Sequence, residues 1–315
     1  MKKGVISLGE ALIDFIPMDH TNMNYIKSPG GAPANVAVGI ARLGASSTFL
    51  GKVGDDVLGH FLRDTLKSYG VWTDQMHFSN EVKTGLVFVT LAENGERSFD
   101  FYINPSADRF LEEKDLDERV FQTNKILHFG SISLISEPAK SATKKAVQFA
   151  KGNGMIVSYD PNLRLGLWEN SDVARETIIS MLSEADVLKI SEEELEFITG
   201  EKDIEEGVRK LNPYNIPFIV VTLGAEGSYV FLGGESTHVP AMKVKAVDTT
   251  GAGDAFVSGI LYKLEKRREG IKNLSMEEAK EIGQFASVSG GLAASTKGAM
   301  TALPTISEVE QILRG

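Results

Sequence analysis

Short apolar runs and stretches of helical periodicity alternate along most of this chain. Apolar runs near 5–8, 48–53, 126–129, 155–160, 186–190 and 218–222 predict buried β-strands. Helical spacing of apolar residues predicts helices near 36–43, 54–69, 136–152, 171–184, 203–211, 275–295 and 306–313. Alternating strands and helices favour a parallel sheet with right-handed crossovers and helices on both faces. We therefore predict an α/β fold with a doubly wound, mainly parallel sheet, with antiparallel strands near 229–232 and 237–239 at its edge.

Two regions interrupt this alternation. The pieces 11–17 and 25–27 look extended, and strand-like segments at 86–91 and 97–103 are joined by a turn that contains Asn94-Gly95, a strong hairpin signal. We predict that both regions form a small β-sheet lid over the main domain. This assigns residues 1–10, 29–83 and 106–315 to a large α/β domain, and 11–28 and 84–105 to the lid.

Composition and charge narrow the class of protein. The 315 residues are 42% hydrophobic and 24% charged, which is ordinary for a soluble globular chain. The absence of cysteine excludes disulfides, cysteine-bound zinc and thiol catalysis. A formal net charge of −10 gives no basic footprint for nucleic acid, and no apolar run approaches the roughly 18 residues needed to cross a bilayer. We expect a cytoplasmic protein that binds neither nucleic acid nor membrane.

The segment from Val247 to Phe256 carries the clearest candidate chemistry. Gly251 and Gly253 let the backbone approach a ligand closely. The helical spacing that follows places them at a helix N-terminus, where N–H groups and the helix dipole bind anions. Asp254 would repel an anion, which suits a base that deprotonates a nucleophile attacking a bound phosphate. The same segment is also typical of a glycine turn before an acidic first helical turn, so alone it leaves both interpretations open.

Several familiar catalytic motifs are absent from the sequence. It contains no Walker-type phosphate loop, no G-x-S-x-G nucleophile elbow, and no G-x-G-x-x-G after the first strand. The five histidines are scattered and form no H-x-x-x-H pair, which favours structural roles for them over metal binding.

Two segments carry a resemblance to a known family. Gly30-Gly31-Ala32-Pro33-Ala34-Asn35-Val36-Ala37 is similar to the N-terminal signature of the ribokinase-like (PfkB) carbohydrate kinases, and Asp248-Thr249-Thr250-Gly251-Ala252-Gly253-Asp254 is similar to their C-terminal signature. The resemblance extends essentially from end to end. It implies a doubly wound α/β domain with a β-sheet lid, phosphorylation of sugar-like alcohols from ATP with Mg²⁺, and a lid through which two copies of the chain form a homodimer.

The C-terminal signature carries the chemistry that the resemblance implies. Asp254 resembles the catalytic base that takes the proton from the sugar hydroxyl. The backbone N–H groups of 251–253 resemble the anion hole for the γ-phosphoryl group, which suits a transfer that depends mainly on positioning and charge neutralisation. Asp248 and Thr250 correspond to positions that coordinate a monovalent cation, K⁺, in many relatives.

Residues near the first strand resemble the family's sugar-binding positions. Asp14 follows that strand, and Gly30, Gly31 and Asn35 belong to the N-terminal signature. A carboxylate and an amide suit polyol recognition because each fixes hydroxyl orientation by hydrogen bonds. Asp14 is also compatible with an acid on the lid surface, and Asn35 with an N-cap for the following helix. Arg164 either lies near the sugar or phosphate or pairs with an acid on the rim.

Further segments resemble the nucleotide side of the family's site. Besides Gly251 and Gly253, the matching residues are Ser191, Thr222, Gly224, Gly227, Lys297 and Gly298. Glu194 matches the glutamate of the family's Asn-x-x-Glu motif, which acts on the magnesium–phosphate network, but Ser191 replaces the asparagine. A run of three glutamates is also typical of a solvated first helical turn.

Within the family, several blocks are most similar to those of bacterial fructokinases. They are 30–35, Asp160-Pro161-Asn162-Leu163-Arg164, the block 189–194, and Ser106-Ala107-Asp108. The expected activity is therefore ATP-dependent phosphorylation of D-fructose to fructose 6-phosphate. Ketodeoxygluconate kinases are the nearest alternative, because Arg164 or Arg97 could hold their acidic substrate; ribokinase is another. A non-catalytic sugar- or nucleotide-binding regulator is the alternative from a different class, although such a protein has no need for Asp254.

Overall fold

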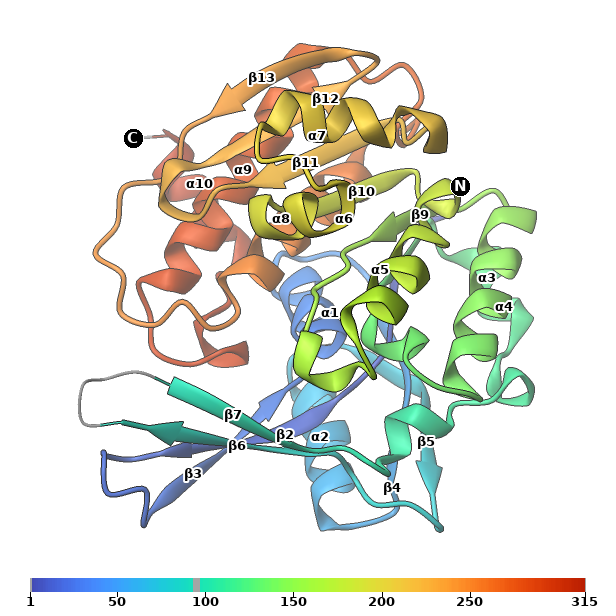
Figure 1. Cartoon of the computed structure of the whole chain (residues 1–315), viewed down its shortest axis with the longest axis vertical. Helices are drawn as coiled ribbons and strands as arrows, with labels where there is room; N and C mark the ends of the chain where they lie inside the picture. Colours follow the sequence, from blue (N-terminus) through green and yellow to red (C-terminus); the bar gives the residue numbers. More distant parts are fainter. Residues whose placement is uncertain (1, 93–96, 315) are drawn as a thin grey trace.

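The computed structural model describes residues 2–92 and 97–314, most of which surround two β-sheets (Figure 1). In these residues nine strands form the large sheet, in the order β13-β12-β11-β10-β9-β8-β1-β4-β5. Strands β11 to β5 run parallel, and β12 and β13 are antiparallel at one edge. The strands are β1 Val5–Leu8, β4 Ser47–Gly54, β5 Trp72–Ser79, β8 Ile126–Phe129, β9 Ile156–Tyr159, β10 Val187–Ser191, β11 Phe218–Thr222, β12 Ser228–Leu232 and β13 Glu235–Val239. The predicted α/β fold is confirmed.

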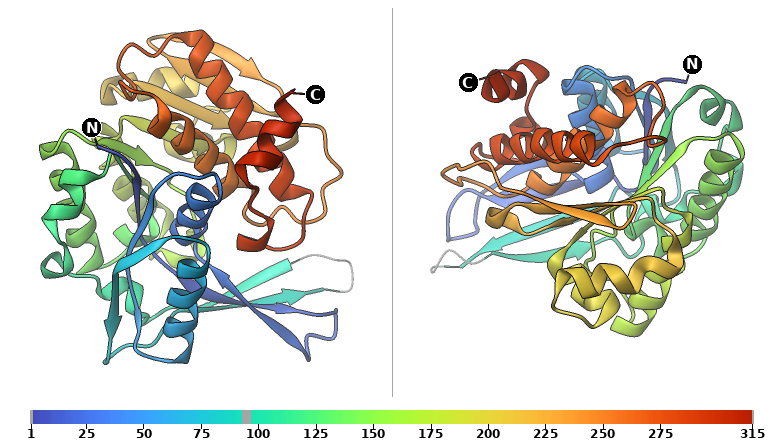
Figure 2. Two further views of the ribbon diagram at one scale, coloured as in Figure 1. Left: turned by 180° about the vertical axis from the view of Figure 1, so that it is seen from behind. Right: turned by 90° about the horizontal axis from the view of Figure 1, so that it is seen from above.

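Helices cover both faces of the large sheet (Figure 2). One face packs against α4 Ala139–Gly152, α5 Ser171–Ile179, α6 Glu192–Thr199 and α7 Ile204–Leu211; the other packs against α1 Ala32–Arg42, α8 Ala252–Lys266 and α9 Met276–Ala294. Alternate side chains of each strand reach opposite faces, so Ile6 and Leu8 of β1 join the first core and Val5 joins the second. The remaining helices are α2 Val57–Ser68, α3 Glu118–Thr123 and α10 Ile306–Arg314. Within the described residues, no helix combines the length and apolar composition that crossing a bilayer requires.

The second, four-stranded sheet is the lid, in the order β3-β2-β6-β7. Its strands are β2 Leu12–Pro17, β3 Tyr25–Gly30, β6 Leu86–Leu91 and β7 Arg97–Tyr102. An aromatic cluster holds them together, because the ring of Phe88 stacks on Phe15 at 4.8 Å and meets Tyr25 and Tyr102 edge-on at 5.5 Å. Strands β6 and β7 pair antiparallel, as predicted, whereas the Asn94-Gly95 turn lies outside the described residues. A single residue, Gly31, separates β3 from α1, and its φ of 99° favours glycine.

Strand β5 is an element that the apolar pattern did not predict. Its sequence, from Trp72 to Ser79, is largely polar, and the Trp72 side chain is exposed. It is an edge strand that pairs only with β4 among the described strands. Central parallel strands are recognised by continuous apolar runs, because both of their faces are buried. An edge strand that is partly exposed does not need such a run.

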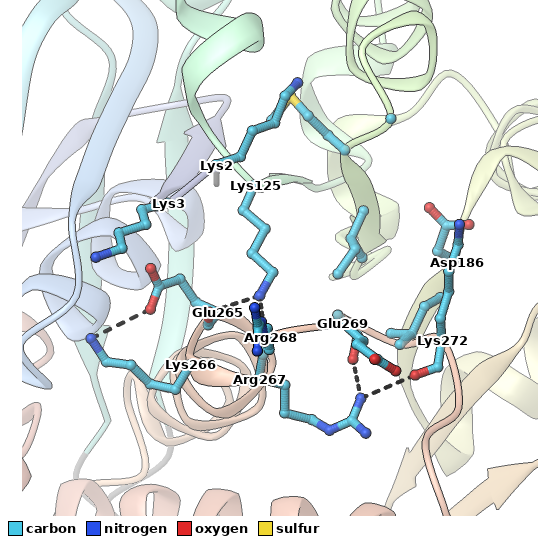
Figure 3. Close-up of a pocket in the computed structure, with 15 residues that line it drawn as sticks. Lys2, Lys3, Lys125, Asp186, Glu265, Lys266, Arg267, Arg268, Glu269 and Lys272 are labelled. Atoms are coloured by element: carbon cyan, nitrogen blue, oxygen red, sulfur yellow. Dashed lines mark hydrogen bonds and ion pairs between the residues drawn. The ribbon is translucent and has the colours of Figure 1, made fainter.

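The amino ends of the strands surround a cavity of about 790 Å³, the amino-end cavity (Figure 3). Its charged lining residues are Lys2, Lys3, Lys125, Asp186, Glu265, Lys266, Arg267, Arg268, Glu269 and Lys272. The ammonium of Lys125 donates to the backbone oxygens of Glu265, at 2.8 Å, and Arg267 at the end of α8. The ammonium of Lys2 donates to the backbone oxygen of Asn153, at 2.6 Å, where α4 ends. Because helix C-termini carry partial negative charge and unpaired carbonyls, these lysines act as helix caps.

Candidate active site

The carboxyl ends of the strands and the lid enclose a second cavity, of about 620 Å³, which we call the lid cavity. It brings together residues from segments far apart in the chain, as expected for the carboxyl edge of a parallel sheet. Eight residues named from the sequence line it: Asp14, Gly31, Asn35, Arg164, Thr250, Gly251, Gly253 and Asp254. Gly30 does not line it, but a Cβ there would lie 2.2 Å from Oδ2 of Asp14, so glycine leaves room for that carboxyl group.

Helix α8 begins at this cavity, as the glycine pattern predicted. Gly251 is its N-cap, with a left-handed φ of 78°, and a Cβ at this position would lie 3.2 Å from Cα of Ala299. The first N–H groups of a helix have no intrahelical acceptor and attract anions. Gly251 and Gly253 both line the lid cavity, so the start of α8 offers an anion site at its wall.

Asp254 lies on the first turn of α8 and is held by α1. Nδ2 of Asn35 donates to Oδ2 of Asp254 at 2.7 Å. Burial raises the pKa of Asp254 to about 6, although the hydrogen bond from Asn35 and the charges of Lys189 and Arg164 oppose the rise. A carboxyl group with this pKa is largely ionised at neutral pH and can accept a proton from a hydroxyl group.

Two more buried carboxyl groups line the lid cavity. Burial, reinforced by the charge of Asp254, raises the pKa of Asp14 to about 7. Burial also raises the pKa of Glu10 to about 8, and the charge of Asp108 adds to the shift. Oε1 of Glu10 accepts a hydrogen bond from the N–H of Ala32 at 3.2 Å, at the start of α1. Glu10 was not singled out from the sequence, although its position two residues after the end of β1 was an available signal.

A third cavity, of about 470 Å³, lies beside α9 and is called the α9 cavity. Thr222, Gly224, Gly227 and Gly253, which resemble nucleotide-side positions of the family, line it, and their contacts with a nucleotide stay predictions. Its other lining residues are Ala225, Ala241, Met242, Lys243, Val244, Ala246, Thr249, Ala252, Phe256, Ser287, Gly290, Gly291 and Ala294, most of which the sequence did not single out. Thr249 and Gly253 line both this cavity and the lid cavity, so the two cavities meet at the start of α8.

Ser191, Lys297 and Gly298 do not belong to the lining of the α9 cavity. Gly298 instead donates its N–H to Oδ2 of Asp248 at 3.2 Å, while Oδ1 of Asp248 accepts from the N–H of Thr250 at 3.1 Å. Asp248 thereby ties the segment before α8 to the segment after α9. Nucleotide contacts for Ser191, Lys297 and Gly298 and a cation site at Asp248 and Thr250 stay predictions.

Ser191 and Glu194 form the capping box of α6. Oγ of Ser191 accepts from the N–H of Glu194 at 3.2 Å, and Oε2 of Glu194 accepts from the N–H of Ser191 at 2.9 Å. Oε1 of Glu194 accepts from the N–H of Leu163 at 2.7 Å. Glu194 therefore lies in the first turn of α6, but it is partly buried and hydrogen-bonded rather than solvated, and a role at a metal stays a prediction.

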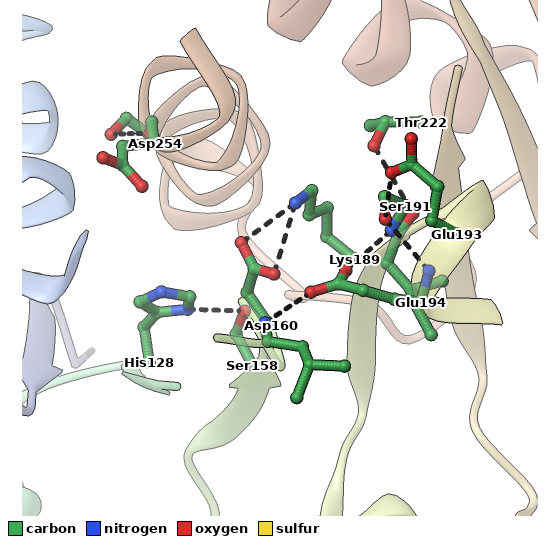
Figure 4. A network of polar contacts seen from close by, with 12 residues as sticks. His128, Ser158, Asp160, Lys189, Ser191, Glu193, Glu194, Thr222 and Asp254 are labelled. Atoms are coloured by element: carbon green, nitrogen blue, oxygen red, sulfur yellow. Dashed lines mark hydrogen bonds and ion pairs between the residues drawn. The ribbon is translucent and has the colours of Figure 1, made fainter. Parts of the chain in front are cut away.

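A buried ion pair lies next to Asp254 (Figure 4). Nζ of Lys189, from β10, is 3.2 Å from both carboxylate oxygens of Asp160, which follows β9. The sequence analysis used both residues only as parts of longer blocks. Asp160 could have been found from its position at the carboxyl end of a strand, whereas Lys189 lies inside a strand and gave no such signal.

Comparison with known proteins gives one consistent result. A family model described as pfkB family carbohydrate kinase matches residues 2–306. Probable fructokinase-6, chloroplastic, from Arabidopsis thaliana is 48% identical over 98% of this chain and 82% of its own length. A crystal structure of a fructokinase double mutant from Vibrio cholerae O395, bound to fructose, ADP and potassium ion, shares 41% identity with a TM-score of 0.90 and covers 99% of this chain and 98% of that one. The aminoimidazole riboside kinase from Salmonella enterica, complexed with aminoimidazole riboside and an ATP analogue, shares 31% identity with a TM-score of 0.88, over 99% and 100% of the two chains.

Proposed function

Because the chain belongs to the pfkB family of carbohydrate kinases, we propose that its cleft transfers the γ-phosphoryl group of ATP to the primary hydroxyl group of D-fructose, giving fructose 6-phosphate. The observation that carries this proposal is the position of Asp254. It lines the lid cavity directly after Gly253, which lines both the lid cavity and the α9 cavity, and it lies on the first turn of a helix whose N-terminus attracts anions. A nucleoside triphosphate in the α9 cavity and a sugar in the lid cavity would meet at this base.

The transfer requires one proton acceptor and a site for the transferred group. Asp254 takes the proton of the sugar hydroxyl as its oxygen attacks phosphorus, and the hydrogen bond from Asn35 keeps the carboxylate oriented. The backbone N–H groups at the start of α8, from Gly251 to Gly253, stabilise charge on the equatorial oxygens of the phosphoryl group. The lid covers the reacting groups and excludes water.

The lid cavity suits a neutral polyol better than a sugar acid. Its lining includes three carboxyl groups, those of Glu10, Asp14 and Asp254, and one cationic side chain, Arg164. A carboxylate on the substrate would be repelled by any of the three that is ionised. This charge pattern favours fructose over ketodeoxygluconate.

The residues of the cleft suit a divalent cation that is bound mainly by the substrate. In the described part of the chain, no group of three or more His, Cys, Asp or Glu side chains forms a metal cage. Mg²⁺ commonly binds through one or two carboxylates, water and substrate phosphates, and Glu194 is the carboxylate that we propose for it. Mg²⁺ neutralises charge on the phosphates when bound. We propose K⁺ as a second cation, near Asp248 and Thr250.

We propose that two copies of the chain associate through their lids. Five large apolar side chains of the lid are exposed: Met18, Met23, Ile26, Phe99 and Tyr102. They lie in the connection between β2 and β3, on β3 and on β7, and exposed apolar surface of this kind marks interaction sites. We also propose a cytoplasmic location, in keeping with the cysteine-free sequence.

A coupled kinase assay across several acceptors tests the proposed function. With ATP and Mg²⁺ we expect the highest kcat/KM on fructose, and lower values on ribose and ketodeoxygluconate. Asp254→Asn keeps the shape of the side chain but cannot accept the proton, so kcat should fall about 10²- to 10⁴-fold while nucleotide binding survives. Near-normal turnover in this variant would refute the role of Asp254. Faster turnover of another acceptor would change only the sugar, and sugar or nucleotide binding without turnover in the wild-type protein would favour a regulator.

A further inference from the structure

The ion pair of Lys189 and Asp160 is largely removed from water, and removing charges from water costs free energy. The side chains are 12% and 7% exposed, and Nζ of Lys189 is equidistant from the two oxygens of Asp160. Removing two ions from water often costs more than their mutual attraction returns, so an apolar pair of similar size is commonly as stable or more stable. Stability of the fold is therefore a weak reason for the pair, and its position suggests another.

Lys189 remains a cation in this environment. Burial alone would lower its pKa, but the carboxylates of Asp160, Glu194 and Asp254 surround the ammonium and together raise the pKa above its ordinary value. Figure 4 shows the side chain extending from β10 toward Asp160, beside α8. A full positive charge thus lies close to the catalytic base.

The ammonium also lies near Gly253, where the two cavities meet, although Lys189 itself is not among the residues that line either cavity. An ideal Cβ on Gly253 would lie 4.0 Å from Nζ of Lys189, and no other atom outside the local backbone comes that close to it among the described residues. In a helix the Cα–Cβ bond is tilted toward the N-terminus. The ideal Cβ of Gly253, and with it the nearby ammonium, therefore lies on the side of the anion site at the start of α8. Gly253 has no side chain to fill the space, and it lines both cavities.

We propose that Lys189 is a further catalytic residue, whose ammonium contacts the γ-phosphoryl group of bound ATP while Asp160 holds it in place. During transfer the sugar oxygen bonds to phosphorus, the bond from phosphorus to the bridging oxygen breaks, and its electron pair leaves with ADP. The sugar proton passes to Asp254. Lys189 keeps its protons and stabilises negative charge on the phosphoryl oxygens from beside the helix. This inference rests on the proposed kinase function.

The test compares single and double variants at a pH near 8.5, where Asp254 is ionised. Lys189→Met leaves Asp160 as an unpaired buried charge, which can itself disturb the fold. The double variant Lys189→Met with Asp160→Asn removes both charges and keeps both shapes, so it separates the structural role of the pair from catalysis. We expect kcat of the double variant to fall about 100-fold, with the KM for fructose within about twofold of wild type. A double variant with wild-type kcat would overturn the proposal.

Nucleotide binding supplies an independent readout. Because the proposed contact is with the γ-phosphoryl group, the double variant should bind the non-hydrolysable analogue AMP-PNP about tenfold more weakly and ADP as wild type does. An equal effect on both nucleotides, or none, would contradict the contact. If the double variant fails to fold, a crystal structure of the wild-type protein with AMP-PNP and fructose decides, since Nζ of Lys189 must then lie within hydrogen-bonding distance of a γ-phosphate oxygen. Wild-type turnover of fructose tests the proposed function separately.

Discussion

The two ends of the large sheet place opposite charges against opposite helix ends. At the amino end, lysines meet helix C-termini, and Lys125 and Lys2 donate directly to terminal carbonyls. At the carboxyl end, acidic side chains gather where α8 and α1 begin, and Asp254 and Glu10 lie there. Both arrangements follow from the helix dipole, yet only the second has the residues of a reaction site.

The difference lies in which partners satisfy the polar groups. At the amino end, Lys2 and Lys125 each donate to two carbonyl oxygens of the chain itself, so these two ammonium groups are engaged in capping. At the carboxyl end, burial holds the pKa values of Glu10, Asp14 and Asp254 above their ordinary range. A charge that merely complements a helix end therefore indicates a helix cap. Acidic side chains with raised pKa values in a cavity indicate a candidate catalytic site. A cavity's size does not separate the two, because the amino-end cavity is the larger one.

The largest expected effect comes from changing the backbone at the carboxyl end. Gly251→Ala places a Cβ in the left-handed region and 3.2 Å from Cα of Ala299, which displaces the N–H groups of the anion site. We expect kcat to fall about 100-fold. The matched control is Gly200→Ala, since Gly200 has a similar φ of 76° at the end of α6, with open space around it. The control should lose about 1 kcal/mol of stability and keep its kcat. Equal loss of kcat in both variants would show that strain, rather than the anion site, is responsible.

An intermediate effect is expected from pH, because the acid must be deprotonated to work as a base. Asp254 has a pKa of about 6 in the folded protein, so kcat/KM should fall about tenfold per pH unit below pH 6. The hydrogen bond from Asn35 lowers that pKa. In Asn35→Ala the acidic limb should therefore move to higher pH, as measured in a pH profile of kcat/KM. A limb that stays in place or moves to lower pH would disprove the coupling.

The smallest effect is expected at the amino end. Lys125→Met removes the ammonium that caps α8, and should lower the free energy of unfolding by about 1 kcal/mol without changing kcat. The control is Lys3→Met, because the Lys3 side chain lines the same cavity but has no hydrogen-bond or ion-pair partner within the described chain. It should leave the denaturation midpoint unchanged. A change of kcat in either variant would mean that the amino end contributes to the reaction.

Much of the fold and the central part of the site could be predicted from the sequence. Parallel strands are apolar runs because both faces are buried, so most strands of the large sheet were visible, and polar β5 was not. Gly251 and Asp254 were visible because an anion site at a helix start depends on a local spacing of residues. Thr222 and Gly224, which line the α9 cavity, were named from the family resemblance, because on its own their segment indicates only a turn between strands.

The residues that the sequence did not reveal depend on contacts between distant segments. Lys189 lies between apolar residues inside β10, and its partner Asp160 lies 29 positions away. The sequence around either residue therefore does not indicate a buried ion pair. Glu10 was not singled out, because nothing local shows that α1 begins against its carboxyl group. Burial of an ionisable side chain is a property of the assembled cleft.

The short connection at Gly31 links the position of the lid to the position of Asp254. Strand β3 of the lid runs into α1 through this one residue, and four positions later Asn35 holds Asp254. Because the connection is so short, a tilt of the lid would be passed directly to α1 and to the amide group of Asn35. We therefore expect that a sugar that draws the lid toward the large domain would also orient the carboxyl group of Asp254. Such coupling would protect a kinase from futile hydrolysis of ATP, because a water molecule in the place of the acceptor makes too few contacts to move the lid.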